Sequence, residues 1–354
     1  MSDERVAILA EGLFDDVHAK TAHGVLRYGR REVVAVVDSR HAGRTAVDVE
    51  PFCLRPVPIV ASVAEAIERA ATCLLIGVAP TGGRLDAAWR AMLLEAIAAG
   101  LDIEAGLHTP LGEDPELRAA AERSGVRLRD FRSAPADLDV PQGPGARPAG
   151  VRVVHSVGSD TVIGKKVVTL ELDRAARKRG LRSVFVATGQ TGIAIAGWGI
   201  AVDHVIADYV AGAAERLVHE GARRGDLLFV EGQGALFHPA YSGVTLGLLH
   251  GAAPDALVLA HRVGATAIRN YPDLPLLPLP ALIEAYEAIA RPVRPARVAA
   301  IALNTGGLDD DAARAAIADA EAACGVVADD VIRFGAERVL DAVLEAAAPR
   351  ARSR

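Results

Sequence analysis

The sequence has few cysteines and no spacing of them that would bind zinc or form a disulfide framework. Only Cys53, Cys73 and Cys324 occur, far apart and without a CxxC pair. Structural zinc sites and disulfide-rich folds need such paired spacings. We therefore expect three reduced thiols that pack as small apolar side chains, as in a cytoplasmic protein.

Three further absences narrow the class of protein. No segment approaches the roughly 18 uninterrupted apolar residues of a membrane span. The N-terminal stretch MSDERVAILAEG carries acids and runs directly into an apolar segment, unlike a secretory signal. The formal net charge of -6 lacks the basic excess that is typical of nucleic-acid binding. We expect a cytoplasmic protein that acts on a small molecule and binds neither membranes nor nucleic acids.

The chain of 354 residues is long for a single core, which favours two domains. Apolar runs alternate with amphipathic segments in both halves, a pattern typical of α/β folds with parallel sheets. The stretch SAPADLDVPQGPGARPAG, residues 133–150, is rich in Pro, Gly and Ala and has no periodicity. We predict a first domain over residues 1–135, a linker over 136–150 and a second domain over 151–354.

The first half has the strand and helix alternation of a Rossmann-like sheet but lacks its glycine fingerprint. The run EVVAVVDS ends at Asp38, where an acid would suit a ribose hydroxyl. The segment AEGLFDDVHAKTAHG contains no GxGxxG, so nicotinamide binding is not expected. We interpret Asp38 as a structural or substrate-side residue.

The second half opens with the outline of a phosphate-binding loop. The apolar run VRVVHSV is followed by GSDTVIGKK, in which Lys165 stands at the start of an expected helix. Backbone N–H groups of small residues and the positive helix end favour an anion there. The next residue, Lys166, replaces the Ser or Thr that holds magnesium in nucleotide hydrolases. Two adjacent ammonium groups suit an anion that is bound but not cleaved, although Lys166 is equally explained as a solvated residue of the helix surface.

A second motif follows the strand-like run DLLFV. It ends in Glu231, continues through Gly232, Gln233 and Gly234, and reaches His238 before a proline. A carboxylate at the C-terminal tip of a strand beside the phosphate strand is placed where such folds carry catalytic or metal-binding acids. The glycines allow the backbone to pass close to a ligand.

Together, GSDTVIGK and VEGQGAL resemble the phosphate loop and strand end of dethiobiotin synthetases, which implies a P-loop fold from about residue 150 onward. A longer series resembles a family long classified as a domain of unknown function, some members of which are D-glutamate N-acetyltransferases. It comprises GSDTVIGKK, VATGQTG, VEGQGALFHPAYSGVTLGLLHGAAPDALVLAHR and ALNTGGL. In the first half, AKTAHGVLRY, VVAVVDS, GVAPTGGRL, GLHTPLG and DFR resemble the same family. The resemblance covers nearly the whole chain.

The resemblance implies an α/β protein of two domains, one Rossmann-like and one P-loop NTPase-like with a dethiobiotin-synthetase-like sheet. It implies an N-acetyltransferase that uses acetyl-coenzyme A (acetyl-CoA) as co-substrate and most favours D-glutamate as acceptor. Lys165 would then hold the pyrophosphate. The expected cofactor-binding residues are Gly158, Ser159, Asp160, Thr161, Gly164, Lys165, Lys166 and Asn304. Two alternatives stay open: an ATP-dependent ligase or kinase acting on a small carboxylate, and a non-catalytic cofactor-binding regulator.

Acetyl transfer needs a neutral amine, a stabilised oxyanion and a grip on the substrate carboxylates. Glu231, His238 and Lys165 are the catalytic candidates, although His238 is equally explained as a cap of its loop. The candidate substrate-binding residues are Gln190, Thr191, Gln233, His261, Arg262 and Arg27. The alternatives are a strand-end turn for Gln190 and Thr191, a hydrogen-bonded position in the core for His261, and a solvated surface position for Arg262 and Arg27. If Mg²⁺ binds, Asp160 and Glu231 are the expected ligands. We also expect a homo-oligomer, a dimer or a tetramer.

Overall fold

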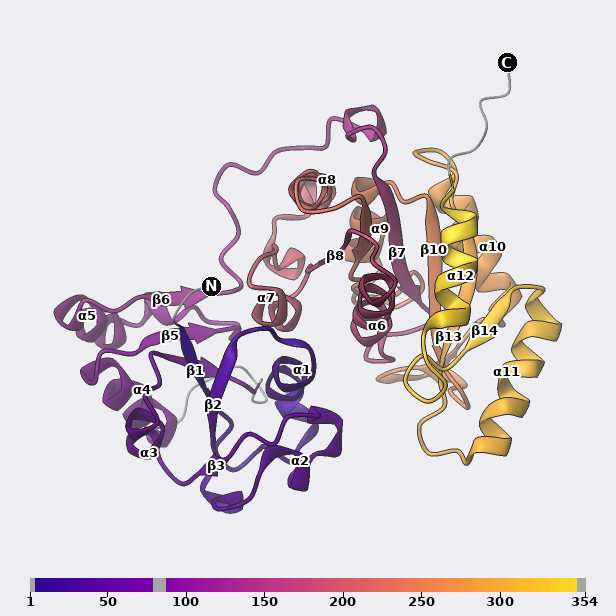
Figure 1. Cartoon of the computed structure of the whole chain (residues 1–354). Coiled ribbons are helices and arrows are strands. Elements are labelled where there is room, and N and C mark those ends of the chain that lie inside the picture. Colours follow the sequence, from indigo (N-terminus) through magenta and orange to yellow (C-terminus); the bar gives the residue numbers. More distant parts are fainter. Residues whose placement is uncertain (1–3, 79–86, 349–354) are drawn as a thin grey trace. The chain divides into compact units, whose positions relative to one another are not determined.

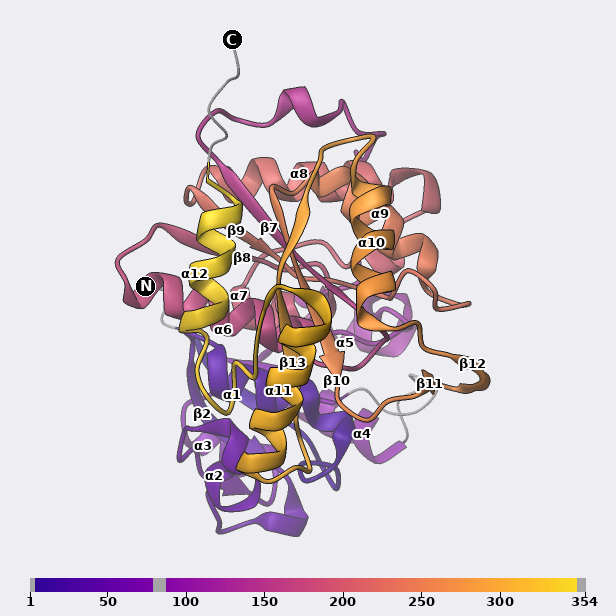
Figure 2. The same ribbon diagram turned by 90° about the vertical axis from the view of Figure 1, so that its right-hand side faces the viewer.

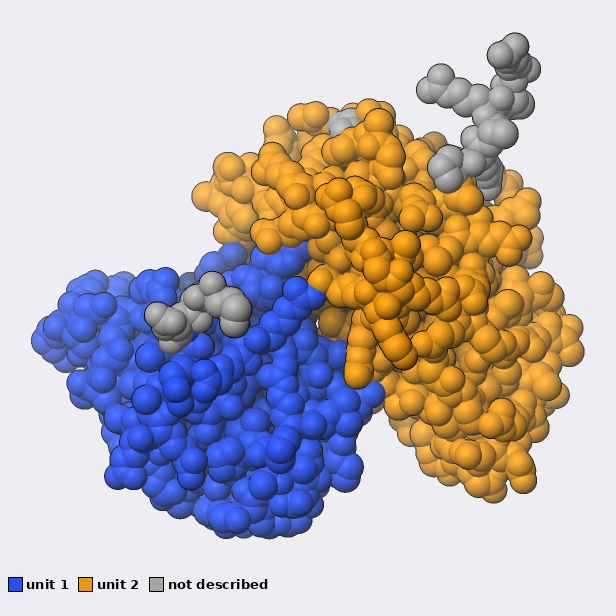
Figure 3. Space-filling view, viewed as in Figure 1, with its two compact units in different colours: residues 1–133, 189–201 blue, residues 134–188, 202–354 orange. Residues whose placement is uncertain are grey.

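The computed structural model describes residues 4–78 and 87–348. The chain forms two compact units (Figure 3): unit 1 comprises residues 1–133 and 189–201, and unit 2 comprises residues 134–188 and 202–354. Most of the family-like segment GVAPTGGRL lies outside the described residues. No helix of the described part is long and apolar enough to cross a membrane.

Unit 1 is built on a parallel sheet of six strands in the order β3-β2-β1-β4-β5-β6. The strands are β1 (Arg5–Leu9), β2 (Glu32–Val37), β3 (Ile59–Val60), β4 (Cys73–Ile76), β5 (Asp102–Ala105) and β6 (Leu128–Asp130). The helices are α1 (Lys20–Tyr28), α2 (Ala46–Val49), α3 (Val63–Glu68), α4 (Ala87–Ala98) and α5 (Pro115–Ser124). The strand order reverses between β1 and β4, as in Rossmann folds. In Figure 1, α3, α4 and α5 lie on one side of this sheet and α1 on the other. The predicted Rossmann-like sheet is confirmed.

The carboxylate of Asp38 is hydrogen-bonded to other groups of the protein. It is fully buried at the end of β2. Oδ1 accepts the backbone N–H groups of Gly12 at 3.0 Å and Arg40 at 3.2 Å, and Oδ2 lies 2.6 Å from Nδ1 of His41. Asp38 therefore joins the turns that follow β1 and β2, which is the structural role considered for it.

Unit 1 also contains residues that we expected in the second domain. Helix α7 (Gln190–Ala196) packs on α1, where the buried hydroxyls of Thr21 and Thr191 are 2.7 Å apart. Arg31 donates to the carbonyl of Ala194 at 3.3 Å, and Arg129 donates to the carbonyl of Gly197 at 3.0 Å. The predicted division of the chain differs from the structure here, because these bonds attach residues 189–201 to the first sheet.

The same two arginines meet a buried carboxylate of β5. Glu104 pairs with Arg31 at 2.7 Å and with Arg129 at 2.9 Å, and Arg31 also pairs with Glu4 at 3.1 Å. Removing one partner of a buried ion pair is costly, about 3–5 kcal/mol. Cys73 lies beside this cluster with a raised thiol pKa caused mainly by burial. The Arg31 guanidinium already supplies the positive charge, so the cluster is a structural ion network and not a metal site.

Unit 2 has a second parallel sheet of six strands in the order β14-β13-β10-β7-β9-β8. The strands are β7 (Arg152–Gly158), β8 (Ser183–Val186), β9 (Leu227–Val230), β10 (Ala256–Arg262), β13 (Arg297–Asn304) and β14 (Val327–Asp329). The helices are α6 (Lys165–Lys178), α8 (Val210–Ala222), α9 (Ser242–Ala252), α10 (Leu279–Ala290), α11 (Asp310–Cys324) and α12 (Glu337–Ala346). A separate antiparallel hairpin consists of β11 (Ala267–Ile268) and β12 (Tyr271–Pro275). The second predicted parallel sheet is thus confirmed.

Helices cover both faces of the second sheet. Along β10, Ala256, Val258 and Ala260 face a core shared with α6 and α12, while Leu257 and Leu259 face a core shared with α9, α10 and α11. The two sets alternate because successive side chains of a strand point to opposite faces. Figure 2 shows α12 on one side of the strands and α9 and α10 on the other. Strand β7 is therefore central and buried, with β9 and β10 as its neighbours.

The Pro- and Gly-rich segment expected to be a linker is attached to unit 2. The backbone N–H groups of Gln142 and Gly143 donate to the Glu215 carboxylate on α8, at 2.7 and 2.8 Å. Arg147 pairs with Asp255 at 2.8 Å. The chain passes from unit 1 to unit 2 between residues 133 and 134, at the start of this segment.

Candidate phosphate-binding site

The loop between β7 and α6 has the conformation that its glycines predict. Gly158 ends β7, and Gly164 precedes α6 with a φ of 112°, a left-handed conformation that favours glycine. Val162 also has a positive φ, 55°, and its side chain is exposed. A β-branched residue is strained in this region, and such strain is concentrated at functional sites. The loop is therefore held in shape by its surroundings.

Lys165 begins α6 with its side chain buried beneath this loop. Its ammonium donates to the carbonyl of Asp160 at 2.6 Å. Burial lowers the pKa of Lys165 to about 8, and the nearby carboxylates of Asp160 and Glu231 oppose that decrease. The structure thus brings together the loop, the lysine and the strand-end acid that the sequence predicted to be neighbours.

Glu231, which follows β9, is buried and bonded to the end of β8. Its Oε2 accepts the backbone N–H of Thr188 at 3.0 Å, and the Thr188 hydroxyl donates to the Glu231 carbonyl at 2.9 Å. The side chain of Gln233 donates to the same hydroxyl at 3.2 Å. These bonds fix the backbone between the ends of two neighbouring strands, and Thr188 is a contributor that sequence reasoning did not single out.

Asp160 joins the phosphate loop to the β11–β12 hairpin. Its Oδ1 accepts the backbone N–H of Thr161 and its Oδ2 accepts that of Arg269, both at 2.7 Å. Both oxygens are thus engaged, and Lys166 stands where a magnesium-binding hydroxyl would be. The roles of Asp160 and Glu231 as Mg²⁺ ligands stay predictions.

Three further side chains support the loop. His261 Nδ1 lies 2.9 Å from the Ser159 hydroxyl, and burial lowers the pKa of this imidazole. The amide of Asn304 donates to the carbonyl of Ile163 at 3.3 Å. The buried Tyr286 hydroxyl donates to the carbonyl of Gly158 at 2.7 Å. Tyr286 has no motif around it in the sequence, so only the packing of α10 reveals its role.

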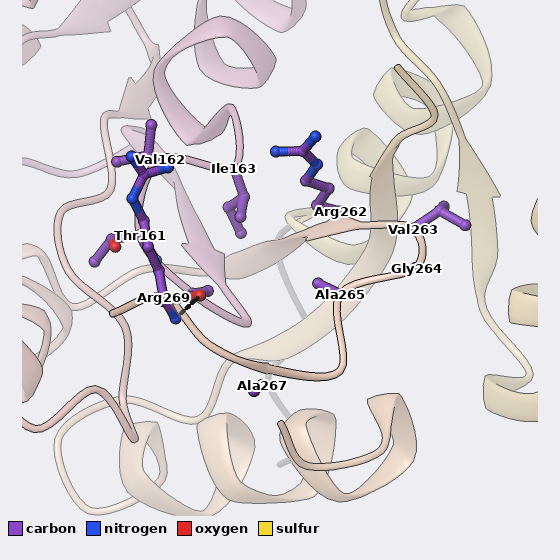
Figure 4. Close-up of a pocket in the computed structure, with 10 residues that line it drawn as sticks. Thr161, Val162, Ile163, Arg262, Val263, Gly264, Ala265, Ala267 and Arg269 are labelled. Carbon is purple, nitrogen blue, oxygen red and sulfur yellow. Dashed lines mark hydrogen bonds between the residues drawn. The ribbon is translucent and has the colours of Figure 1, made fainter. Parts of the chain in front are cut away.

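A pocket of about 370 Å³ opens beside the loop (Figure 4). Its lining consists of loop residues 160–163 together with residues 262–265, 267 and 269. The side chains of Arg262 and Arg269 come from the two ends of the second segment, and Ile163 lies between them in this view. The pocket therefore combines apolar walls with two guanidinium groups.

His238 lies further along the segment that follows β9. It is buried, and its ring packs 4.7 Å from that of Tyr241 and perpendicular to that of Tyr271, 5.4 Å away. Nδ1 accepts the backbone N–H of Ala240 at 3.2 Å, so the neutral ring carries its proton on Nε2. Among the described residues, this buried Nε2 has no hydrogen-bond partner. In the described part of the chain, Arg5 Nε and His219 Nε2 are buried without a partner as well, and each such group calls for an explanation because buried polar atoms are nearly always hydrogen-bonded.

The other predicted residues lie elsewhere or have protein partners. Gln190 and Thr191 belong to unit 1, where Gln190 packs against Gly106. Arg27 also belongs to unit 1, donates to the carbonyl of Phe52 at 3.1 Å and lies 4.4 Å over the Phe52 ring. Lys166 is half-buried on α6. The structure does not bring Gln190, Thr191 and Arg27 into the P-loop unit, and their binding roles stay predictions.

The fold and this loop define an α/β protein that combines a Rossmann-like unit with a P-loop unit. Residues 143–340 match the P-loop domain, and residues 39–134 the Rossmann-like domain, of the family of unknown function DUF1611. The chain belongs to this family.

Two proteins similar to this chain have names that state an activity. A protein from Tritonibacter scottomollicae named D-glutamate N-acetyltransferase is 39% identical over 281 residues, 79% of this chain and 83% of that protein. A protein of the same name from Pseudoalteromonas sp. is 40% identical over 208 residues, 59% of this chain and 61% of that protein. The crystal structure of a DUF1611 family protein from Anabaena variabilis is 42% identical, with a TM-score of 0.90, over 97% of this chain and 100% of that one.

The close approach at Gly232 generates a testable prediction. A Cβ at this position would lie 1.9 Å from the Ser156 carbonyl oxygen and 3.0 Å from Cδ of Lys165. We expect Gly232→Ala to lower the free energy of unfolding by about 2 kcal/mol or more, because backbone must shift. Gly243→Ala is the matched control, since nothing lies within 4 Å of its Cβ and it is helical. Urea unfolding followed by circular dichroism measures both, and equal stabilities would contradict the prediction.

Proposed function

We propose that this protein transfers the acetyl group of acetyl-CoA to the amino group of D-glutamate. Support comes from two relatives that are named D-glutamate N-acetyltransferase and from the phosphate loop described above. Acetyl-CoA carries a pyrophosphate that has to be held without being cleaved. In our proposal, the loop and Lys165 bind that pyrophosphate as a handle.

The observation that carries the proposal is the absence of a magnesium-binding hydroxyl after Lys165. Lys166 occupies that position, and an ammonium repels a divalent cation. The hydroxyl of Thr169, on the same helix, is buried and lies 2.7 Å from the Lys165 carbonyl and 2.8 Å from the Ser156 hydroxyl. Phosphoryl transfer relies on a metal ion bridging the phosphates, whereas simple anion binding does not.

The proposal changes the role of Glu231. In acetyl-CoA, the pyrophosphate and the thioester lie at opposite ends of the long pantetheine arm. Because Glu231 lies near Lys165 and accepts the Thr188 N–H, it belongs to the pyrophosphate end. We assign it to positioning Lys165 and the end of β8, in place of the general-base role considered from the sequence.

The reaction itself replaces a thioester by an amide. The amine nitrogen attacks the carbonyl carbon, the C–N bond forms, the C–S bond breaks, and the proton lost by the amine ends on the coenzyme A thiol. Negative charge develops on the carbonyl oxygen, and a preorganised N–H donor stabilises it. In our proposal Nε2–H of His238 makes this donation, because Ala240 already donates to Nδ1 and the ring nitrogen that remains is a donor. Since that nitrogen is buried among Tyr241 and Tyr271, substrate binding has to expose it.

A direct assay tests the proposed function. Purified protein is mixed with acetyl-CoA and a panel of D- and L-amino acids, and thiol release is measured together with the mass of the product. We expect N-acetyl-D-glutamate and stoichiometric coenzyme A, with D-glutamate preferred over L-glutamate. A parallel incubation with ATP, Mg²⁺ and carboxylic co-substrates separates the alternative ligase or kinase. Steady ADP formation without acetyl transfer would overturn the proposal.

The lowered pKa of Lys165 predicts how acetyl-CoA affinity depends on pH. Below its pKa of about 8 the free protein already carries the proton, so the dissociation constant stays level. Above that pH, Lys165 has to take up a proton when the pyrophosphate binds, so the dissociation constant of acetyl-CoA rises by up to about tenfold per pH unit. Calorimetric titrations from about pH 7 to about pH 9.5 measure this. Lys165→Ala should bind more weakly without the rise, and a level wild-type profile would contradict the assignment.

Two substitutions distinguish a hydrogen-bond donor at position 238 from a general base at the same position. His238→Phe fills the space without a donor, and we expect kcat to fall by about 10²–10³-fold. His238→Gln retains an N–H donor, so its loss should be clearly smaller and KM for acetyl-CoA nearly unchanged. Steady-state kinetics of both variants, with thermal melting to check folding, give the comparison. Equal losses in the two folded variants would reject donation and favour a base.

A further inference from the structure

We propose that the pocket beside the phosphate loop binds the 3′-phosphate of the coenzyme A ribose, held by Arg262 and Arg269. This inference rests on the proposed function, because it takes acetyl-CoA as the acetyl donor. It assigns a second anion subsite, separate from the pyrophosphate cradle at Lys165. The ligand class is a nucleotide that carries a phosphate on its ribose.

The position of Arg269 is set by the phosphate loop itself. Its backbone N–H donates to Oδ2 of Asp160 at 2.7 Å, so residue 269 is attached to the loop that would hold the pyrophosphate. Arg262 ends β10, the strand directly beside β7. Both side chains line the pocket, in agreement with Figure 4. The two guanidinium groups are therefore held beside the cradle by different elements.

Like Arg291, another exposed arginine of unit 2, Arg262 and Arg269 have no acidic partner among the described residues; they are distinguished by lining one pocket together. Arg147 and Arg294 both pair with Asp255, at 2.8 and 2.6 Å. By contrast, no described residue forms an ion pair or a hydrogen bond with the guanidinium of Arg262 or Arg269. Asp160 also lines the pocket, but both of its oxygens accept backbone N–H groups. Both side chains are exposed and line the same pocket, and the planar guanidinium fork suits a phosphate bound there.

The pocket lies beside the loop proposed to bind the pyrophosphate, and this position decides which anion the pocket can bind. An acceptor carboxylate has to lie near the thioester, at the far end of the pantetheine arm. A ribose phosphate lies close to the pyrophosphate and so reaches a pocket that shares residues 160–163 with the cradle. The volume of about 370 Å³ lies within the range of small-ligand pockets, and Ile163 and Val263 supply apolar walls for the adenosine. The pocket therefore fits the nucleotide end of coenzyme A, and not the dicarboxylic acceptor for which Arg262 was considered.

The experiment compares coenzyme A with 3′-dephospho-coenzyme A. Calorimetry measures the affinity of both for the wild type, Arg262→Ala and Arg269→Ala, and kinetics measures kcat/KM for their acetylated forms. Arg291→Ala is the matched control, an exposed arginine that follows α10 and does not line the pocket. We expect the wild type to prefer the 3′-phosphorylated form by about tenfold, since two guanidinium groups would each add a charge-assisted bond to the phosphate and each is weakened by its exposure to solvent.

In each pocket variant we expect most of that preference to be lost, through weaker binding of coenzyme A and unchanged binding of the dephospho form. Arg291→Ala should retain the wild-type preference. Equal affinities in the wild type, or a preference that both variants retain, would overturn the subsite while leaving acetyl transfer intact. A 3′-phosphate preference without any acetyl transfer would instead overturn the proposed function and leave the subsite standing.

Discussion

The burial of one ammonium group is the constraint on which the P-loop unit depends. Lys165 lies beneath a loop whose backbone carbonyl at Asp160 accepts a hydrogen bond from its ammonium, with the carboxylates of Asp160 and Glu231 nearby. Burying a charge is expensive unless partners compensate. The loop, the end of β9 and the hairpin that Asp160 holds are therefore coupled to one side chain. This coupling explains why Gly232, which passes against both Ser156 and Lys165, has no room for a side chain.

The residues around Lys165 and the residue His238 lie in two different polar environments. Around Lys165, polar atoms are engaged with backbone groups: Asp160 with two N–H donors, Glu231 with Thr188, and Tyr286 with Gly158. Such a preorganised polar shell positions an anion rigidly. His238 differs from this shell, since its buried Nε2 has no partner among the described residues. The proposed acetyl transfer would use both kinds of environment, a satisfied one to bind the coenzyme A phosphates and an unsatisfied donor to stabilise the transition state.

Much of the fold was predictable because both sheets are parallel. Their strands are buried on two faces and appear as continuous apolar runs, so VRVVHSV and DLLFV were recognisable without any structure. The Gly-Lys pair located the loop, and the apolar run before Glu231 indicated a strand end that the structure places beside β7. The resemblance of these motifs to a known family supplied the rest of the fold class.

Other features depended on contacts that local sequence does not record. Residues 190–196 form a helix that is buried along most of its length, and the local sequence does not say which sheet such a helix covers; the bonds from Arg31 and Arg129 decide it. The engagement of both Asp160 oxygens required knowing that residue 269 lies against the loop. The tautomer of His238 likewise follows from one backbone N–H, which no motif encodes.

The exchange of residues 189–201 into unit 1 has a consequence for how the protein is made. The chain passes between the units at residues 133–134, 188–189 and 201–202. Domains generally fold as units during synthesis, the N-terminal one first. Here unit 1 lacks α7 until β7, α6 and β8 of unit 2 have already left the ribosome. Unit 1 can therefore reach its complete native structure only after residue 201 has been translated, when part of unit 2 has already been synthesised, and neither unit corresponds to a continuous gene fragment.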